Sequence, residues 1–350
     1  RSFTPPLLVY RHAGRFILQD GHQRSMAWAL PRLRVEAASG DGLLSIDGHR
    51  YPDAVVLAPQ EQGDRFDVIN HVPLERYLPG VLERELYGQW HPEAFVAQAV
   101  AARSYALFER QLHAQRAYDL ESTTASQVYR GAATNPKAVE AVQRTRGMVL
   151  VHAGRIVPAF FSSCCGGTGQ AASAAFPRLA SAVDIPPLRG ARCGGWCQAS
   201  PNYRWGPILR DTSMLAKRIA AWGRANRHPV AQLEGLRDIR ISELSGTGRP
   251  AAFVIIDRRG RRFTLPAESF RFACNYAGAG LPAVEPAQQL KSSHVRVRLT
   301  GRTVRFEDGR GHGHGVGLCQ WGAQGMAQQG YDGLAIVRFY YPGATIQRIY

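Results

Sequence analysis

Residues 92–107 read PEAFVAQAVAARSYAL and predict a helix in the core of the protein. Pro92 suits the first helical position, and Glu93 follows in the first turn, where the helix dipole favours an anion. Alanine recurs along the segment, so little side-chain bulk keeps a neighbouring backbone away. We therefore expect other elements to pack closely around this helix.

Arg103 stands inside the apolar surface of the predicted helix. Its neighbours one turn away are Ala99, Val100, Ala106 and Leu107. A buried guanidinium without a partner is very costly. Arg103 must therefore reach water along its aliphatic stem or pair with an anion.

Two carboxylates precede Arg103 on another predicted helix. Residues 74–86 carry an apolar stripe at three-four spacing, and Pro79-Gly80 predicts a kink or a break within it. Glu83 and Glu85 lie near its end. Either residue is a reasonable partner for Arg103. The pair could be a plain ion pair between helices or part of a functional site, and both interpretations stay open here.

The composition is that of an ordered globular protein with an unusual charge. Apolar residues make up 45% of the 350-residue chain, and 43 Lys and Arg against 27 Asp and Glu give a net charge of +16. The sequence lacks an uninterrupted apolar run of about 18 residues, so it predicts no membrane-spanning helix. A basic surface favours a polyanionic partner such as nucleic acid, anionic lipid or an anionic wall polymer.

The order of the patterns predicts an α+β protein with a helical core packed against antiparallel β elements. Short apolar stretches such as 15–18 and 54–57 alternate with turns at the start of the chain. We expect four regions: a β-rich region at 1–70, a core at 71–204 with the helices of Glu85 and Arg103, an inserted α/β subdomain at 205–294, and a Gly/His loop with helices at 295–350 that completes the core.

A Gly/His loop near the C-terminus is a second candidate for chemistry. Residues 311–323 read GHGHGVGLCQWGA. Glycines at this density allow close approach of the backbone to a ligand or another segment. His312 and His314 alternate, so on an extended backbone they share one side. They suit acid-base chemistry or metal binding, and the spacing does not choose between these.

The cysteines form a third group of candidates. They comprise the adjacent pair Cys164 and Cys165, the C-x3-C pair Cys193 and Cys197, and the single residues Cys274 and Cys319. A metal site or a disulfide, ordinary buried thiols, and a nucleophile at residues 162–168 are all compatible with this pattern. The nucleophile hypothesis lacks the G-x-S-x-G pattern and an obvious residue to orient the base.

Several blocks together resemble the sporulation stage II protein D family, also called the SpoIID/LytB or amidase-enhancer domain. Residues 72–81 (VPLERYLPGV), Glu85 and residues 92–106 carry the resemblance first. It continues through SQVYRG at 126–131, CGGT at 165–168, SPNYRW at 200–205, GTGR at 246–249, LKSS at 290–293, GHGVGLCQWGA at 313–323 and FYYPG at 339–343.

The resemblance implies a lytic transglycosylase of peptidoglycan that cleaves the MurNAc-GlcNAc bond of peptide-stripped glycan strands and forms 1,6-anhydroMurNAc. The family's catalytic carboxylate falls on Glu85. The candidate substrate-binding residues are Arg103, Gln127, Ser163, Thr168, Tyr203, Arg204, His314 and Gln320. No cofactor is expected to be required. A structural Zn²⁺ or a disulfide is expected among Cys165, Cys193, Cys197 and Cys319.

One carboxylate is enough for this reaction. Glycoside hydrolases generally use two, whereas here the 6-hydroxyl of the sugar acts as nucleophile. Glu85 would serve first as acid and then as base, and an acid must be protonated when the substrate binds. A directly paired Arg103 would favour the ionised form of Glu85. We therefore expect Arg103 to bind mainly substrate or another acid such as Glu83.

Two other functions remain as alternatives. The first is a non-catalytic wall-binding module that enhances an N-acetylmuramoyl-L-alanine amidase. The second, nucleic-acid binding, is disfavoured because the arginines are scattered and no basic-aromatic ladder is present. We expect an exported protein, periplasmic or associated with the cell wall; the start at Arg1 does not argue against export. Some sporulation members of the family look to have a zinc site with His and Cys ligands near the position of residues 118–129. This segment contains neither residue type here, so that particular metal site is not expected.

Overall fold

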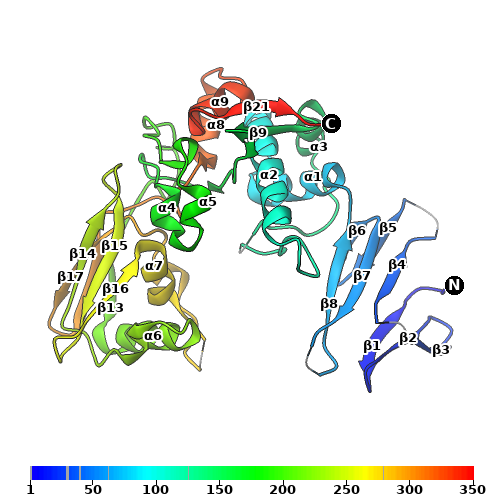
Figure 1. Cartoon of the computed structure of the whole chain (residues 1–350), viewed down its shortest axis with the longest axis horizontal. Coiled ribbons are helices and arrows are strands. Elements are labelled where there is room, and N and C mark those ends of the chain that lie inside the picture. Colours follow the sequence, from blue (N-terminus) through cyan, green and yellow to red (C-terminus); the bar gives the residue numbers. More distant parts are fainter. Residues whose placement is uncertain (1, 29–30, 39–40, 62, 125, 279) are drawn as a thin grey trace. The chain divides into compact units, whose positions relative to one another are not determined.

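The computed structural model describes residues 2–28, 31–38, 41–61, 63–124, 126–278 and 280–350 (Figure 1). Helices alternate with many small sheets, and this confirms the predicted α+β class. The chain divides into two compact units. The first comprises Arg1–Gly88 and Ala106–Arg146, and the second comprises Gln89–Tyr105 and Gly147–Tyr350.

The first unit begins with short antiparallel strands in small sheets, ordered β1-β2-β3, β4-β7-β8 and β5-β6. The strands are β1 (Leu8–His12), β2 (Arg15–Gln19), β3 (Ser25–Trp28), β4 (Leu33–Glu36), β5 (Leu43–Ile46), β6 (His49–Pro52), β7 (Ala54–Pro59) and β8 (Phe66–His71). β2 and β7 confirm the strands predicted at 15–18 and 54–57. Phe16, Leu18, Leu33, Val55 and Leu57 form their apolar core.

Helix α1 (Leu74–Glu85) follows β8 and continues through Pro79, so the predicted break does not occur. A side chain at Gly80 would collide with the carbonyl of Gly131 and the ring of Tyr129. The Pro79-Gly80 step therefore lets the loop at 126–131 pack directly on the helix.

Two further helices follow α1, and the first of them corresponds to the helix predicted at 92–107. α2 (Pro92–Leu112) is longer than the segment 92–107, and it contributes residues to both units. α3 (Pro136–Arg144) begins after Asn135, whose side chain accepts a hydrogen bond from the backbone N–H of Lys137.

The second unit contains the remaining strands and helices. Its strands are β9 (Met148–His152), β10 (Arg155–Ile156), β11 (Phe161–Ser162), β12 (Arg204–Trp205), β13 (Ile208–Asp211), β14 (Asp238–Leu244), β15 (Pro250–Ile256), β16 (Arg262–Pro266), β17 (Arg296–Thr300), β18 (Thr303–Glu307), β19 (Gly309–Arg310), β20 (Leu318–Cys319) and β21 (Thr345–Arg348). Its further helices are α4 (Ala172–Ala175), α5 (Ala180–Val183), α6 (Thr212–Ala225), α7 (Ala267–Asn275), α8 (Gln320–Gln328) and α9 (Gly333–Tyr340).

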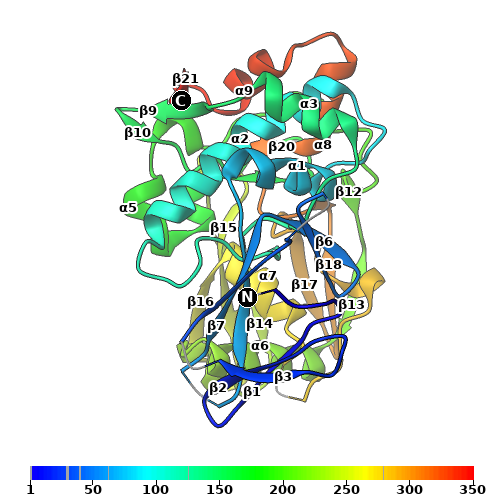
Figure 2. The same cartoon turned by 90° about the vertical axis from the view of Figure 1, so that its right-hand side faces the viewer.

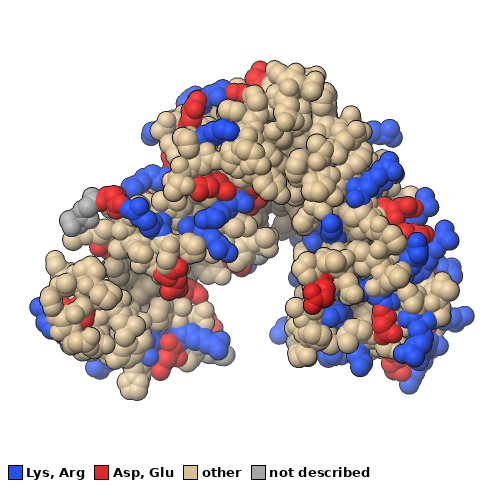
Figure 3. Space-filling model, turned by 180° about the vertical axis from the view of Figure 1, so that it is seen from behind, with Lys and Arg blue, Asp and Glu red and all other residues tan. Residues whose placement is uncertain are grey.

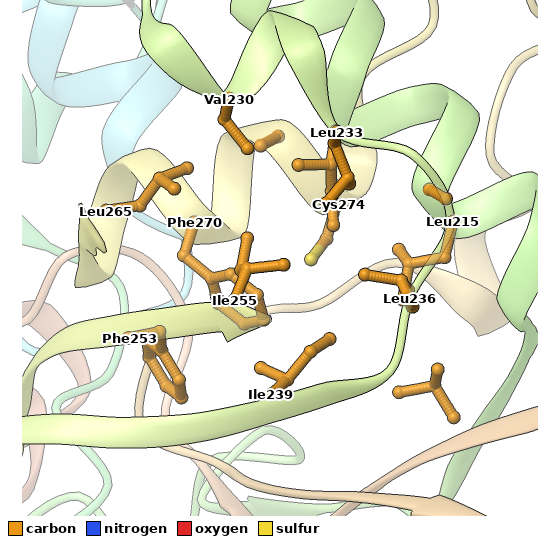
Figure 4. Close-up of a cluster of buried hydrophobic side chains, with 14 of the residues drawn as sticks. Leu215, Val230, Leu233, Leu236, Ile239, Phe253, Ile255, Leu265, Phe270 and Cys274 are labelled. Carbon is orange, nitrogen blue, oxygen red and sulfur yellow. The ribbon is translucent and has the colours of Figure 1, made fainter. Parts of the chain in front are cut away.

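A subdomain between β13 and β18 has its own apolar core. Sheets β13-β18-β17 and β14-β15-β16 lie beside helices α6 and α7 (Figures 1 and 2). Figure 4 shows aliphatic and aromatic side chains converging between these elements, with the ring of Phe253 stacked on Phe270 at 4.2 Å. The core reaches past residue 294 as far as Phe306, because β17 and β18 pair with β13.

Helices occur in the region 295–350, as expected from the sequence. They include α8 and α9, and the carboxylate of Asp332 caps α9 by accepting a hydrogen bond from the backbone N–H of Ala335 at 2.7 Å. β21 then pairs antiparallel with β9.

Basic and acidic side chains are mixed on one face of the molecule. In Figure 3, Lys and Arg side chains are distributed over this face of the molecule, with Asp and Glu between them. Within the described ranges, no helix is both long enough and apolar enough to cross a membrane.

Candidate functional site

Glu85 ends α1 in the first unit and is half-buried. Its Oε1 accepts a hydrogen bond from the backbone N–H of Val128 at 3.2 Å. The preceding residue, Gln127, is fully buried, and its Oε1 accepts a hydrogen bond from the hydroxyl of Tyr77 on α1 at 3.2 Å. Two hydrogen bonds thus join α1 to the loop that carries Gln127, and they place the candidate acid close to this candidate substrate-binding residue.

Glu83, two residues earlier on α1, binds the segment that precedes α3. Its carboxylate accepts hydrogen bonds from the backbone N–H groups of Thr134 and Asn135 at 2.6 and 3.0 Å, and from the hydroxyl of Thr134 at 3.0 Å. Burial opposes ionisation of Glu83, but these hydrogen bonds outweigh it and lower its pKa. Glu83 therefore holds the start of α3 in place.

Arg103 lies on the part of α2 that belongs to the second unit, and it is completely buried. Its Nη1 donates to the carbonyl of Met148 at 3.2 Å and to that of Ala99 at 3.4 Å. The contact with Met148 joins α2 to β9. The role of Arg103 in binding substrate stays a prediction.

The two histidines of the Gly/His loop have different surroundings. Gly313 between them has a φ of +91°, so the extended backbone on which the shared side depends is absent at this position. His312 is exposed, with its Nδ1 3.3 Å from the side-chain nitrogen of Asn202. His314 packs edge-on against Phe160 and Phe176, and its Nδ1 accepts a hydrogen bond from the N–H of Val316. Burial lowers the pKa of His314 to about 4.

Arg249 supports this loop from the subdomain side, and the sequence analysis did not name it as a site residue. Its side chain is 1% exposed, and its Nη1 donates to the carbonyls of Cys165 and Thr168. A Cβ atom at Gly315 would overlap the same guanidinium. The only sequence signal for Arg249 is its place in the GTGR block, because single arginines are too common in this chain to be informative.

Two of the predicted substrate-binding residues, Thr168 and Tyr203, line one open pocket of about 470 Å³. Arg192 and Arg310 line it too and were also missed from the sequence. The hydroxyl of Tyr203 lies over Gly167. A pocket with two arginines, hydroxyl groups and glycine backbone can bind an anionic or heavily hydroxylated ligand.

The other candidates lie around the same segments of the second unit. Arg204 is exposed, with its guanidinium 6.0 Å from the ring centre of Tyr203. The carbonyl of Ser163 accepts a hydrogen bond from the N–H of Trp321. Gln320 begins α8 and is buried, so it contributes to packing around this loop.

Four of the candidate cysteines lie together. The sulfurs of Cys165, Cys193, Cys197 and Cys319 are all within 4.8 Å of one another, and all four side chains are buried. Each of them is a free thiol. Hydrogen bonding to Cys164 and Cys165 lowers the pKa of Cys197 to about 4, whereas burial raises the pKa of Cys319. Burial also argues against a nucleophilic cysteine in this segment, because a nucleophile must be reached by its substrate.

Comparison with known proteins identifies the family. The family model described as stage II sporulation protein, SpoIID, matches residues 62–152. An uncharacterized protein of Brachyspira hyodysenteriae is 30% identical over 313 residues, which are 86% of this chain and 73% of the relative. The chain therefore belongs to the SpoIID family.

Other relatives that match have descriptive names. The stage II sporulation protein D of Bacillus subtilis is 26% identical over 296 residues, covering 79% of this chain and 75% of the relative. The amidase enhancer of the same organism is 26% identical over 340 residues, covering 90% of this chain. This chain spans 46% of the length of the amidase enhancer.

Proposed function

We propose that this protein is a lytic transglycosylase that cleaves peptide-stripped glycan strands of peptidoglycan outside the cytoplasm. The observation that carries the proposal is the placement of Glu85, a half-buried carboxylate at the end of α1 held by the N–H of Val128. Membership of the SpoIID family supports a role at the cell wall. The net charge of +16 suits a protein that stays on an anionic envelope.

In the proposed reaction Glu85 acts twice. It first donates its proton to the oxygen that links C1 of MurNAc to GlcNAc, and the bond between C1 and that oxygen breaks. The 6-hydroxyl of the same MurNAc attacks C1, and Glu85 takes the hydroxyl proton. The products are a GlcNAc end and a 1,6-anhydroMurNAc end, and no water is consumed. Because the nucleophile belongs to the substrate, a second catalytic carboxylate is unnecessary.

The contacts of Glu85 fix the position of its carboxylate. Val128 and Gln127 belong to one loop that packs on α1 through Tyr77 and Gly80. The carboxylate is therefore positioned by buried main-chain and side-chain contacts, as a group that must protonate a defined oxygen requires. Within this proposal Thr168, Tyr203 and His314 are substrate-binding candidates.

The test is digestion of peptide-free glycan strands with the Glu85→Gln variant. We expect activity to fall by about 10²–10⁴-fold, the usual contribution of a general acid. Formation of 1,6-anhydroMurNAc ends is measured by mass spectrometry. Glu83→Gln is the matched control on the same helix: it weakens the contact with α3 and lowers stability, while the folded protein keeps its activity. Full activity of Glu85→Gln contradicts the proposal.

A second candidate function is enhancement of a cell-wall amidase without catalysis, favoured by the similarity to the amidase enhancer of Bacillus subtilis. The two functions separate in one experiment. As an enhancer, the unmodified protein and the Glu85→Gln variant stimulate an added N-acetylmuramoyl-L-alanine amidase equally, and neither releases anhydro products from glycan alone. As a lytic enzyme, the unmodified protein releases anhydro products from glycan alone, and any stimulation of the amidase is lost in the Glu85→Gln variant.

A further inference from the structure

The sulfur cluster defined by Cys165, Cys193, Cys197 and Cys319 has the geometry of a metal site. Its members come from three separate segments: the turn after β11, the loop before β12 and the end of β20, directly before α8. In a tetrahedral Zn²⁺ site with Zn–S bonds of about 2.3 Å, neighbouring sulfurs lie about 3.8 Å apart. Here the sulfurs of Cys165 and Cys197 are 3.7 Å apart, and no pair in the cluster exceeds 4.8 Å. We propose that these four cysteines bind one structural Zn²⁺ ion.

The donor set favours zinc over other occupants. Four thiolates are soft ligands, and a closed set of four with no position for water is typical of structural zinc. In an iron-sulfur cluster the thiolates bind different iron atoms, so their sulfurs spread farther apart than these do. A disulfide needs two sulfurs about 2.05 Å apart, and it would also leave the other two thiols without a role.

A buried cation stands next to the cluster. Zn²⁺ with four thiolates carries a net charge of −2. Arg249 is 1% exposed and binds the carbonyl of Cys165 at 3.3 Å. Its Nε and Nη2 are buried without a hydrogen-bond partner among the described residues. A buried guanidinium is costly unless a negative charge lies near it. The buried carboxylate of Glu268 supplies one such charge, and a zinc-thiolate centre would add another.

The sulfurs also have the outer contacts of a metal site. The backbone N–H of Cys165 donates to the sulfur of Cys319 at 3.2 Å. The hydroxyl of Tyr340 lies 3.2 Å from the sulfur of Cys193. Cys319 directly precedes α8, where the helix dipole favours a thiolate. Such groups orient the ligands and spread their charge.

The ion would join the walls of the open pocket. The pocket is lined by Gly167 and Thr168, which follow Cys165, and by Gly194 and Gly195, which lie between Cys193 and Cys197. The loop at 189–203 has little regular secondary structure, so a metal ion bound by its two cysteines and by Cys165, in the turn after β11, would add order to it. The metal assignment does not depend on the proposed enzymatic function.

Metal content of the purified protein tests the proposal directly. We expect about one zinc per chain by elemental analysis and native mass spectrometry, and six free thiols after denaturation in the presence of chelator. Replacement by Co²⁺ is expected to give the absorption bands of tetrahedral thiolate coordination. Cys193→Ser is expected to lower zinc content at least about tenfold.

A buried cysteine outside the cluster, Cys274 in the subdomain core, provides the matched control. Cys274→Ser removes a buried thiol of the same kind and is expected to keep about one zinc per chain. If Cys193→Ser does not fold, zinc content and the cobalt spectrum of the unmodified protein decide the question. Protein that stays metal-free after exposure to Zn²⁺, a native disulfide among the four, or stoichiometric iron would each overturn the proposal.

Discussion

The subdomain between β13 and β18 and the Cys/Gly region, defined as residues 160–203 and 309–323, belong to the same unit but are held by different interactions. The subdomain buries aromatic and aliphatic side chains such as Phe253, Ile255 and Phe270 between sheets and helices (Figure 4). The Cys/Gly region has strands of two residues, buried polar groups and clustered thiols. The subdomain thus combines regular helices and strands with apolar packing, whereas the Cys/Gly region combines an irregular backbone with the polar contacts of the pocket.

The largest effect is expected from Phe253→Ala. Phe253 is fully buried and stacks on Phe270, so its loss should lower the free energy of unfolding by about 3–5 kcal/mol. Denaturant unfolding measures this value, with Leu209→Ala on the exposed face of β13 as the control. Alkylation of native protein adds a regional readout: Cys274 should become more reactive while the four clustered thiols stay protected. Parallel exposure of both groups would show that the two regions unfold as one.

Gly315→Ala tests the other side of the comparison. The φ of Gly315 is +74°, and a Cβ atom there would overlap the guanidinium of Arg249. We expect destabilisation of about 1–3 kcal/mol, measured by thermal or denaturant unfolding. Gly246→Ala is the control, because its Cβ would have open space, and the change should stay within about 0.5 kcal/mol. Equal effects of the two substitutions would mean that backbone packing around Arg249 is unimportant.

The smallest effect concerns pH and His294, a subdomain residue whose carbonyl accepts a hydrogen bond from the N–H of Arg310 in the Cys/Gly region. Burial and the nearby Arg249 and Arg310 lower the pKa of His294 from 6.5 to about 3. Between these values the unfolded chain binds a proton that the folded chain does not, so stability is lost as pH falls below 6.5. The free energy of unfolding is expected to fall by about 1 kcal/mol for each pH unit in this range.

His294→Gln should remove this contribution. We expect its stability to fall less steeply than that of the unmodified protein between pH 6.5 and 5, with unfolding followed at each pH. Restricting the range to above pH 5 limits protonation of other buried groups. Identical slopes for the two proteins would show that His294 does not contribute to acid sensitivity.

Much of the regular structure follows from local sequence. The stripe of α1, the Pro92 start of α2 and the Asp332 cap of α9 are signals contained within one or two helical turns, and each corresponds to an observed helix. The Pro79-Gly80 step does not break α1, and the reason for Gly80 is distant in sequence, because this glycine makes room for Gly131.

The sites depended more on contacts between distant residues. Spacing alone left His312 and His314 equivalent, whereas the structure places only His314 against Phe160 and Phe176. Arg249 escaped notice because its neighbours Cys165 and Gly315 lie far away along the chain.

The sequence by itself determined the helices, the α+β class and the family blocks, because periodicity, caps and motifs are local properties of the chain. It also singled out Glu85 and the four cysteines as candidates. Only the tertiary structure decided that Glu83 holds α3, that the Cys165, Cys193, Cys197 and Cys319 sulfurs lie within 4.8 Å, and that Arg249 is buried beside them. These outcomes required residues more than 30 positions apart to meet, and no local pattern encodes which of them do.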